Sequence, residues 1–161
     1  VKMQGNGEVI KHLNGILTNE LTAVNQYFLH SRMLGNWGIQ RLAKHIYDES
    51  IGEMKHADAL IERILLLEGL PNLQDLSKLK IGENTEEIFT CDLAVEMKNF
   101  GDLKEAIVLC EQVSDYVSRE ILTSILDDTE EHIDWIETQQ HLISQIGIEN
   151  YIAENMGGEG A

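Results

Sequence analysis

Apolar side chains recur at intervals of three and four residues along most of this chain, and this period is the strongest constraint on its fold. No stretch alternates polar and apolar residues for long enough to indicate a sheet. The period predicts an all-α fold with helices at about 6–35, 39–67, 85–112 and 115–146, then a short helix at about 148–155. The length of 161 residues suits one domain that covers residues 1–161.

The segment 68–84 has no helical period and contains the only proline, Pro71, which stops the second helix. This segment is long enough to cross the length of a four-helix bundle, so we expect the second and third helices to run parallel. Thr85 and Ser114 are the expected caps of the third and fourth helices. The inward stripe of the fourth helix is expected to include Val117, Ile121, Ile125, Ile136, Leu142 and Ile146.

The charge of the chain excludes some partners. The formal net charge is −16, whereas proteins that bind nucleic acid present stripes of Lys and Arg. An acidic surface attracts cations such as Fe(II), or serves only to keep the chain soluble.

Cys91 and Cys110 fall in one predicted helix, roughly 28 Å apart, and cannot form a disulfide with each other there. Together with the lack of a signal core or a membrane-length apolar run, these cysteines predict a cytoplasmic protein without a membrane partner.

The second helix carries polar residues on the stripe that should face the dry interior of the bundle. Glu49, Glu53 and His56 interrupt a near-heptad series of aliphatic residues. Met54 follows Glu53 and therefore faces away from this stripe. A Glu-x-x-His pair on one face and a soft sulfur on another suggest two iron sites, one inside the bundle and one outside it.

The two halves of the chain repeat this pattern. In each half a Glu precedes the first position of the x-x-His motif by 33 residues. Di-iron carboxylate bundles take one Glu from each of two helices and Glu-x-x-His from each of the other two. Five of these six positions carry such a ligand here: Glu20, Glu53, His56, Glu96 and His132. The sixth is Thr129. Because burying these ionisable groups without a metal is costly, the pattern predicts a two-iron site.

Several blocks of the chain resemble the bacterioferritins. They are NEL at 19–21, NQYFLH at 25–30, EMKHAD at 53–58, LEGLPNL at 67–73 and HIDW at 132–135. The resemblance covers Met3 to Asn155 and implies a ferritin-like bundle, assembled into a hollow 24-subunit shell that oxidises Fe(II) and stores ferric mineral. It also implies that the five Glu and His residues are the iron ligands of a ferroxidase centre.

The resemblance also assigns a role to Met54, that of a haem ligand. In bacterioferritins this Met, supplied by each of two chains across a two-fold axis, provides both axial ligands of one haem b. From its position alone, Met54 indicates no more than a packing residue at an interface. A thioether is a soft ligand that favours reduced haem iron.

The chain departs from the family pattern at three positions. Thr129 stands where members with a complete centre have Glu, and its neutral hydroxyl cannot supply a bridging charge, so we expect an impaired centre. Asp128 and Glu130 are each rotated by about 100° from Thr129, and only a shifted helix would bring Asp128, the nearer candidate, to the site. Asp48 and Gly52 stand where members often have the His and Asp of a cavity-wall iron site; Asp48 could still bind a cation, whereas Gly52 offers no side chain.

Two aromatic residues and the remaining histidines are expected to have mainly structural roles. Tyr27 and Trp135 are expected near the centre, where they pack and could also donate an electron. Four further histidines lack ligand spacing and are expected at the surface or at an interface: His12, His30, His45 and His141.

Two functions are therefore compatible with the sequence. The first is an iron-storage ferroxidase that uses oxygen or peroxide. The second is a haem-binding and electron-transfer subunit, which relies on a second bacterioferritin subunit with a complete centre in a mixed shell; Thr129 favours this for the chain itself. A ferredoxin is a candidate partner for iron release. Rubrerythrin-like peroxidases fit less well because the chain lacks a Cys-x-x-Cys module, and the short terminal helix with Met54 favours a bacterioferritin over both these peroxidases and the manganese catalases. Mini-ferritins fit less well because they lack this complete repeat of ligands on four helices.

Overall fold

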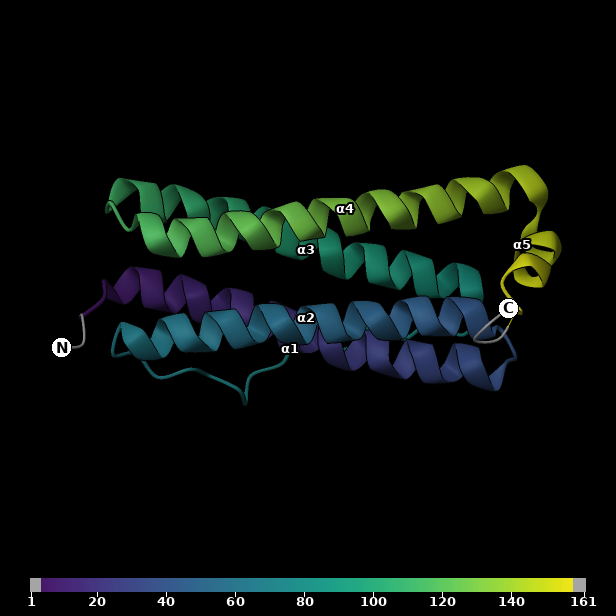
Figure 1. The fold of residues 1–161 in the computed structure, drawn as a ribbon, viewed down its shortest axis with the longest axis horizontal. Coiled ribbons are helices and arrows are strands. Elements are labelled where there is room, and N and C mark those ends of the chain that lie inside the picture. The colour runs from purple at the N-terminus through teal and green to yellow at the C-terminus, as the bar shows by residue number, and fades with distance from the viewer. Residues whose placement is uncertain (1–3, 158–161) are drawn as a thin grey trace.

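Five helices make up the computed structural model, which describes residues 4–157 (Figure 1). They are α1 (Gly7–Asn36), α2 (Gln40–Leu66), α3 (Thr85–Gln112), α4 (Tyr116–Ile146) and α5 (Ile148–Glu154). No strand occurs between residues 4 and 157, so the prediction of an all-α bundle is confirmed. Residues 1–3 and 158–161 of the predicted domain lie outside the described residues. Among the described helices, none is long and apolar enough to cross a membrane.

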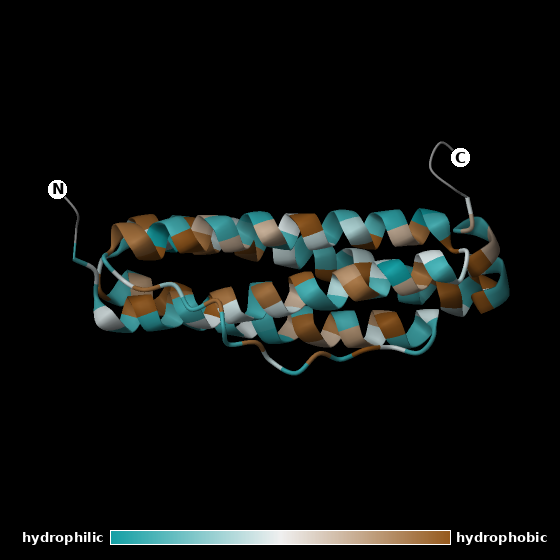
Figure 2. Cartoon of the chain, turned by 90° about the horizontal axis from the view of Figure 1, so that it is seen from below, coloured by the Kyte–Doolittle hydropathy of each residue, from teal (hydrophilic) through white to brown (hydrophobic). Residues whose placement is uncertain are grey.

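The four long helices lie side by side and bury one face each. Polar and apolar residues alternate around every helix, as expected when one side faces a core (Figure 2). The core has two apolar clusters. One is built around Leu13, Leu60, Leu103 and Leu122. The other is built around Tyr27, Ile46, Phe89 and Ile136, with Tyr151 of α5 closing its end. Between the two clusters, at the level of Glu20 on α1, the interior is polar.

The crossover between α2 and α3 runs along the outside of the bundle (Figure 2) and is held by polar side chains of α1. Four backbone N–H groups of the crossover donate to these side chains. The pairs are Asn72 to Asn14 (2.8 Å), Ser77 to Thr22 (3.0 Å), Lys80 to Gln26 (2.9 Å) and Gly82 to His30 (3.0 Å). Because the crossover follows α1 from its start towards its end, α3 runs parallel to α2, as predicted.

The helix caps differ from the prediction by one residue. Asn84 caps α3, and its side chain accepts from the backbone N–H of Glu87 at 2.9 Å. Asp115 caps α4 and accepts from the N–H of Ser118 at 3.0 Å. The prediction of Thr85 and Ser114 as caps is wrong, because the longer amide and carboxylate one position away reach these N–H groups.

The rotation of α4 also differs from the prediction at its two ends. Three residues expected inside are exposed: Val117, Leu142 and Ile146. At the start of α4 the buried residue is Ser118 instead, which accepts a hydrogen bond from Arg63 of α2 at 2.9 Å. Arg63 also pairs with Asp115 at 2.9 Å. This polar contact, which apolar periodicity does not reveal, keeps Ser118 on the inward side at the start of α4.

Candidate metal centre

The side chains of the repeated motif meet halfway along the bundle. Glu20 comes from α1, Glu53 and His56 from α2, Glu96 from α3, and Thr129 and His132 from α4. All of these except His56 are buried, and the His56 side chain is only 14% exposed. Four helices therefore bring three carboxylates and two imidazoles into one apolar bundle, where each charge needs an opposite partner.

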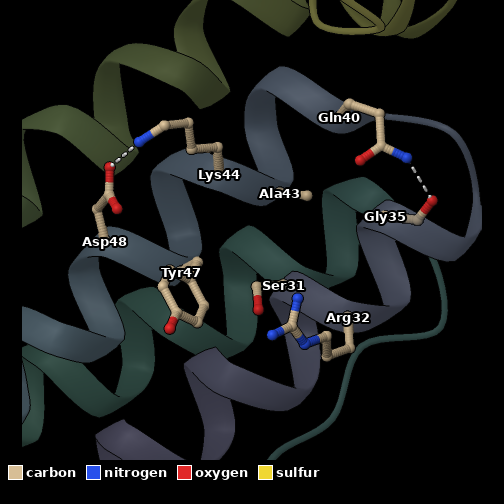
Figure 3. Close-up of a pocket in the computed structure, with 8 residues that line it drawn as sticks. All are labelled: Ser31, Arg32, Gly35, Gln40, Ala43, Lys44, Tyr47 and Asp48. Carbon is tan, nitrogen blue, oxygen red and sulfur yellow. Dashed lines mark hydrogen bonds and ion pairs between the residues drawn. The ribbon is translucent and has the colours of Figure 1, made fainter. Parts of the chain in front are cut away.

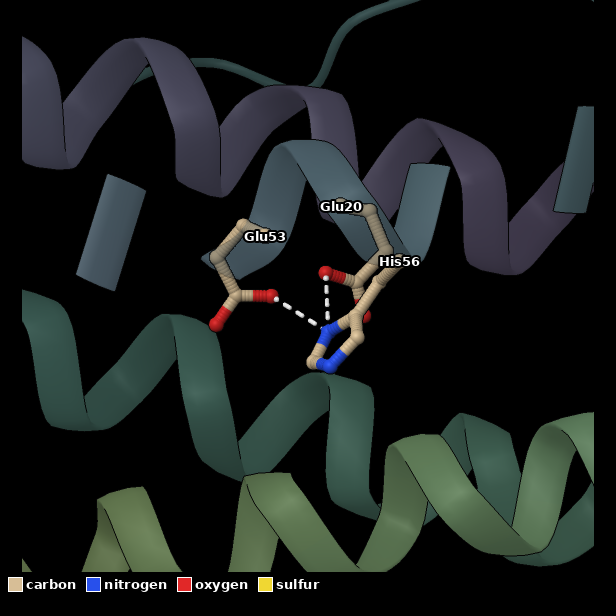
Figure 4. A group of neighbouring side chains, drawn as sticks. All are labelled: Glu20, Glu53 and His56. Atoms are coloured by element: carbon tan, nitrogen blue, oxygen red, sulfur yellow. Dashed lines mark hydrogen bonds and ion pairs between the residues drawn. The ribbon is translucent and has the colours of Figure 1, made fainter. Parts of the chain in front are cut away.

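One group joins α1 and α2. The Nδ1 atom of His56 lies 3.3 Å from Glu20 Oε2 and 3.2 Å from Glu53 Oε2, and the two carboxylates point at the same ring nitrogen (Figure 4). Ligand atoms from these three residues lie within 4.8 Å of one another, so a single cation could contact all of them.

A second group uses Glu53 again, together with Glu49 and His132, and its ligand atoms also lie within 4.8 Å of one another. His132 Nδ1 lies 3.6 Å from Glu49 Oε2 and 3.1 Å from Glu96 Oε1. Although burial raises the pKa of Glu49, its contacts with His45 and His132 keep that pKa below the usual value of a glutamate. Its place on the inward stripe of α2, one turn before Glu53, is the sequence signal of this site residue; no ligand role was predicted for it.

Further polar contacts hold these ligands from outside. Asp128 Oδ2 lies 2.7 Å from His56 Nε2, on the side of the ring away from Glu20. Asn99 donates to Glu20 Oε1 at 2.8 Å. Tyr27 donates its hydroxyl to Glu96. Carboxylate or amide partners of this kind fix the orientation of metal-binding side chains.

The crowding changes the proton affinities of the centre. Burial and the charge of Glu20 raise the pKa of Glu53 to about 8, and burial and Glu53 raise the pKa of Glu96 to about 7. Burial alone would lower the pKa of both histidines, but contacts with Glu20 and Glu53 raise that of His56 to about 11, and contact with Glu96 raises that of His132 to about 9. The centre therefore holds protons that a bound cation would replace.

A pocket connects this centre with the surface between α2 and α4. It is lined by His45, Glu49, Gly52, Glu53, His56, Asp128, Glu131, His132 and Trp135. Gly52 leaves open space there, because a Cβ atom at this position would meet nothing within 4 Å. Ligand atoms of both groups can thus be reached by a small cation through an acidic opening.

Comparison with known proteins agrees with this arrangement. The ferritin-like domain model matches residues 10–146. A bacterioferritin of Mycolicibacterium paratuberculosis is 49% identical over 152 residues, which cover 94% of this chain and 96% of the relative. Bacterioferritin BfrA of Mycobacterium tuberculosis H37Rv is also 49% identical over the same shares. The chain belongs to the bacterioferritin family. A bacterioferritin of Rhodobacter capsulatus is 44% identical over 153 residues, or 95% of both chains.

Thr129 occupies the position where the bacterioferritin pattern calls for a carboxylate. It is buried, and its hydroxyl donates to the backbone carbonyl of Ile125 at 2.8 Å. The hydroxyl is therefore directed along its own helix. Asp128 does not take the place of the missing carboxylate, because its side chain contacts His56 Nε2.

Met54 lies outside this centre, on the solvent side of α2. It is 48% exposed, and Phe28 and Ile51 on the same side of the α1–α2 pair are 46% and 41% exposed. Phe28 packs against Tyr47, one turn before Ile51, with ring centroids 6.2 Å apart. Tyr47, Ile51 and Met54 thus follow one face of α2 and form an exposed apolar strip with a thioether at its end.

Asp48 lies away from the metal centre, in a pocket between the ends of α1 and α2 (Figure 3). Its carboxylate pairs with Lys44 at 3.0 Å, and Arg32 lines the same pocket. Two cationic side chains nearby disfavour a metal ion at Asp48. Gly52 is not among the lining residues of this pocket.

His30 is fully buried, so the prediction of a surface or interface position is wrong for this histidine. Its Nδ1 lies 2.8 Å from Asp92 Oδ1, and its Nε2 accepts from the N–H of Gly82. These partners are 62 and 52 residues away in the sequence, which explains why local spacing gave no signal.

The two aromatic residues predicted beside the centre do lie there. Tyr27 meets the His132 ring edge-on, with centroids 5.4 Å apart. Trp135 stacks on His45 at 3.8 Å. Both make packing contacts with residues that line the centre.

Proposed function

We propose that this chain is a bacterioferritin subunit that binds Fe(II) between its four long helices, oxidises it, and stores Fe(III) mineral inside a 24-subunit shell. The observation that carries the proposal is Glu53, whose carboxylate belongs to both groups of candidate ligands. A carboxylate between two neighbouring cation positions is the arrangement that paired metal ions need. The names of the relatives point to the same storage role.

In the proposed reaction each Fe(II) gives up one electron to oxygen or peroxide. Glu20, Glu53 and His56 supply hard oxygen and imidazole donors for one ion, and Glu96 and His132 supply them for the other, with Glu53 shared. Asp128 and Asn99 would keep His56 and Glu20 in orientation, since they bind His56 Nε2 and Glu20 Oε1 and leave His56 Nδ1 and Glu20 Oε2, which face each other, for the ion. The acidic opening between α2 and α4 admits the cation substrate.

We also propose that Met54 binds haem b across a two-fold axis between subunits. The residues present fit this group: the thioether is exposed on an apolar strip, and one copy of it from each of two chains provides two axial ligands. Bound haem would supply one-electron transfer between the outside of the shell and the stored mineral. Phe28 and Ile51 would exclude water from the haem plane.

A second candidate function follows from Thr129, whose hydroxyl is bonded to its own helix. In this alternative the chain binds haem and forms part of the acidic cavity wall of a mixed shell. A second bacterioferritin subunit with a complete centre performs most of the oxidation. A ferredoxin would deliver electrons for iron release. Either shell would work in the cytoplasm.

The test is the rate of Fe(II) oxidation by shells made only of this chain. We expect slow oxidation, and we expect Thr129→Glu to accelerate it roughly tenfold or more, because a carboxylate is restored between the two ion positions. Thr123→Glu, the same change at an exposed position of α4, serves as the control and should leave the rate unchanged. Fast, stoichiometric oxidation by the unmodified shell would remove the impaired-centre alternative. A shell that binds no Fe(II) between the helices would overturn the proposed centre itself.

A further inference from the structure

The charges of the centre do not balance if only the predicted ligands are counted. Two Fe(II) ions carry four positive charges, whereas Glu20, Glu53 and Glu96 supply three negative ones. A family member with Glu at position 129 would supply four. An uncompensated charge inside a bundle is costly, so a fourth carboxylate within reach of the second ion would strengthen its binding.

Glu49 is placed to supply this charge. It lies one turn before Glu53 on α2, and an oxygen of each carboxylate lies within 4.8 Å of the other and of a ring nitrogen of His132. A single cation placed among these three atoms could contact all of them. His45 Nε2 lies 3.3 Å from Glu49 Oε1, the carboxylate oxygen that does not face His132.

His132 independently indicates that a ligand belongs at this position. Its side chain is 97% buried, since 3% is exposed, and neither ring nitrogen has a hydrogen-bond partner among residues 4–157. Nδ1 lies near Glu96 and Glu49 but is not aligned for a hydrogen bond with either. Oε2 of Glu96 is likewise buried without a partner. Buried polar atoms without partners are rare in folded proteins and are expected where an ion completes the contacts.

We propose that Glu49 is the fourth carboxylate ligand of this chain and replaces the missing Glu at position 129 by binding the second metal ion together with Glu53, Glu96 and His132. This inference rests on the proposed metal centre and identifies how the second ion is held. Asp128 does not take this role, because its carboxylate contacts the outer nitrogen of His56 and its side chain is 56% exposed.

The replacement has a chemical consequence. Glu49 belongs to the group of ligand atoms that contains His132, whereas Glu20 and His56 belong to the other group. It therefore acts as a terminal ligand of one ion and not as a bridge between two. The second ion is bound, but only Glu53 connects it with the first, so the slow oxidation expected of Thr129 shells is retained.

Cobalt(II) alone is a suitable probe, because it is not oxidised under these conditions and accepts the same oxygen and nitrogen donors. Assembled shells would be titrated calorimetrically in high salt, and cobalt positions would be located by anomalous diffraction. We expect two ions per subunit in the unmodified chain. Glu49→Gln should weaken the second ion roughly tenfold or more, while the ion at Glu20 and His56 remains.

Two further variants complete the test. Glu62→Gln, an equal change at an exposed position of α2, should bind both ions as the unmodified chain does. Combining Glu49→Gln with Thr129→Glu should restore the second ion. Binding of the second ion by Glu49→Gln within twofold of Glu62→Gln would overturn the Glu49 proposal, as would a single ion in the unmodified chain. Absence of cobalt from the whole bundle would instead overturn the proposed metal centre.

Discussion

At the scale of single residues, four side chains of the centre have a raised affinity for protons. Glu53 and Glu96 have pKa values raised from 4.5 to about 8 and about 7, and His56 and His132 have pKa values raised from 6.5 to about 11 and about 9. All four shifts have the same sign. Between pH 6.5 and 8 the folded chain therefore binds more protons than the unfolded chain does.

This sign gives a prediction for stability. When the folded state binds more protons, the free energy of unfolding falls as pH rises, so the metal-free shell should lose stability from pH 6.5 to 8. Zn(II) replaces the protons and should reduce this loss. Melting temperatures at pH 6.5, 7.2 and 8 (about three-quarter-unit steps chosen within the shifted range), with and without Zn(II), would measure this loss. Glu53→Gln should show a shallower fall; parallel curves for all samples would contradict the explanation.

The repeat in the sequence was sufficient to bring most of the centre together. Positions 33 residues apart on antiparallel helices of matched length fall at the same level of the bundle, and a His three residues after each lies on the same face. Glu49 was not recognised, although it lies on the same stripe. One turn from Glu53, a Glu can point at the centre or towards solvent, and its contacts with His45 and His132, which come from packing, decide between them.

At the scale of elements, buried polar side chains of α1 join the crossover to α3. His30 of α1 contacts Asp92 of α3 and accepts the N–H of Gly82 in the crossover. Gln26 repeats this pattern one turn earlier, since it donates to Asp92 at 2.9 Å and accepts from Lys80. α1, α3 and the crossover are thus joined at Asp92, four residues before Glu96, and this contact fixes the height of Glu96 in the bundle.

Gly82 provides a test of this attachment. A Cβ atom there would lie 2.4 Å from the backbone nitrogen of Ile88, so Gly82→Ala must displace the crossover and weaken its bond to His30. We expect a loss of about 1–3 kcal/mol of stability, measured by chemical denaturation. Gly101→Ala is the control, because it meets nothing within 4 Å inside α3 and should be neutral or stabilising. Equal stability of the two variants would show that the crossover is not held at Gly82.

The period of apolar residues predicted the helices themselves. It did not predict which residues are buried through contacts with distant parts of the sequence. The length of the crossover predicted parallel α2 and α3, because only a bundle-length connection permits that topology. The burial of Ser118 in place of Val117 depends on Arg63, 55 residues away. The pattern of apolar residues does not reveal such a polar contact, since a buried Ser and an exposed Ser look alike in the sequence.

At the scale of the whole molecule, the outer side of the α1–α2 pair remains uncovered in the single chain. Phe28, Ile51 and Met54 expose apolar surface there, whereas the candidate metal ligands Glu53 and His132 are buried inside the bundle. One helix thus separates an inner polar centre from an outer apolar strip. A two-fold related copy would cover this strip and place two Met54 side chains opposite each other.

The final prediction separates assembly from haem binding. Met54→Leu keeps an apolar side chain of similar volume but removes the sulfur, so we expect shells of unchanged mass that contain little or no haem. Met97→Leu, the same change at another exposed methionine, on α3, should retain haem. Size-exclusion mass and the haem absorption spectrum of both variants would be compared after expression with excess haem. Retention of an unaltered haem spectrum by Met54→Leu would exclude Met54 as the ligand, whereas loss of the shell itself would assign it to packing between subunits.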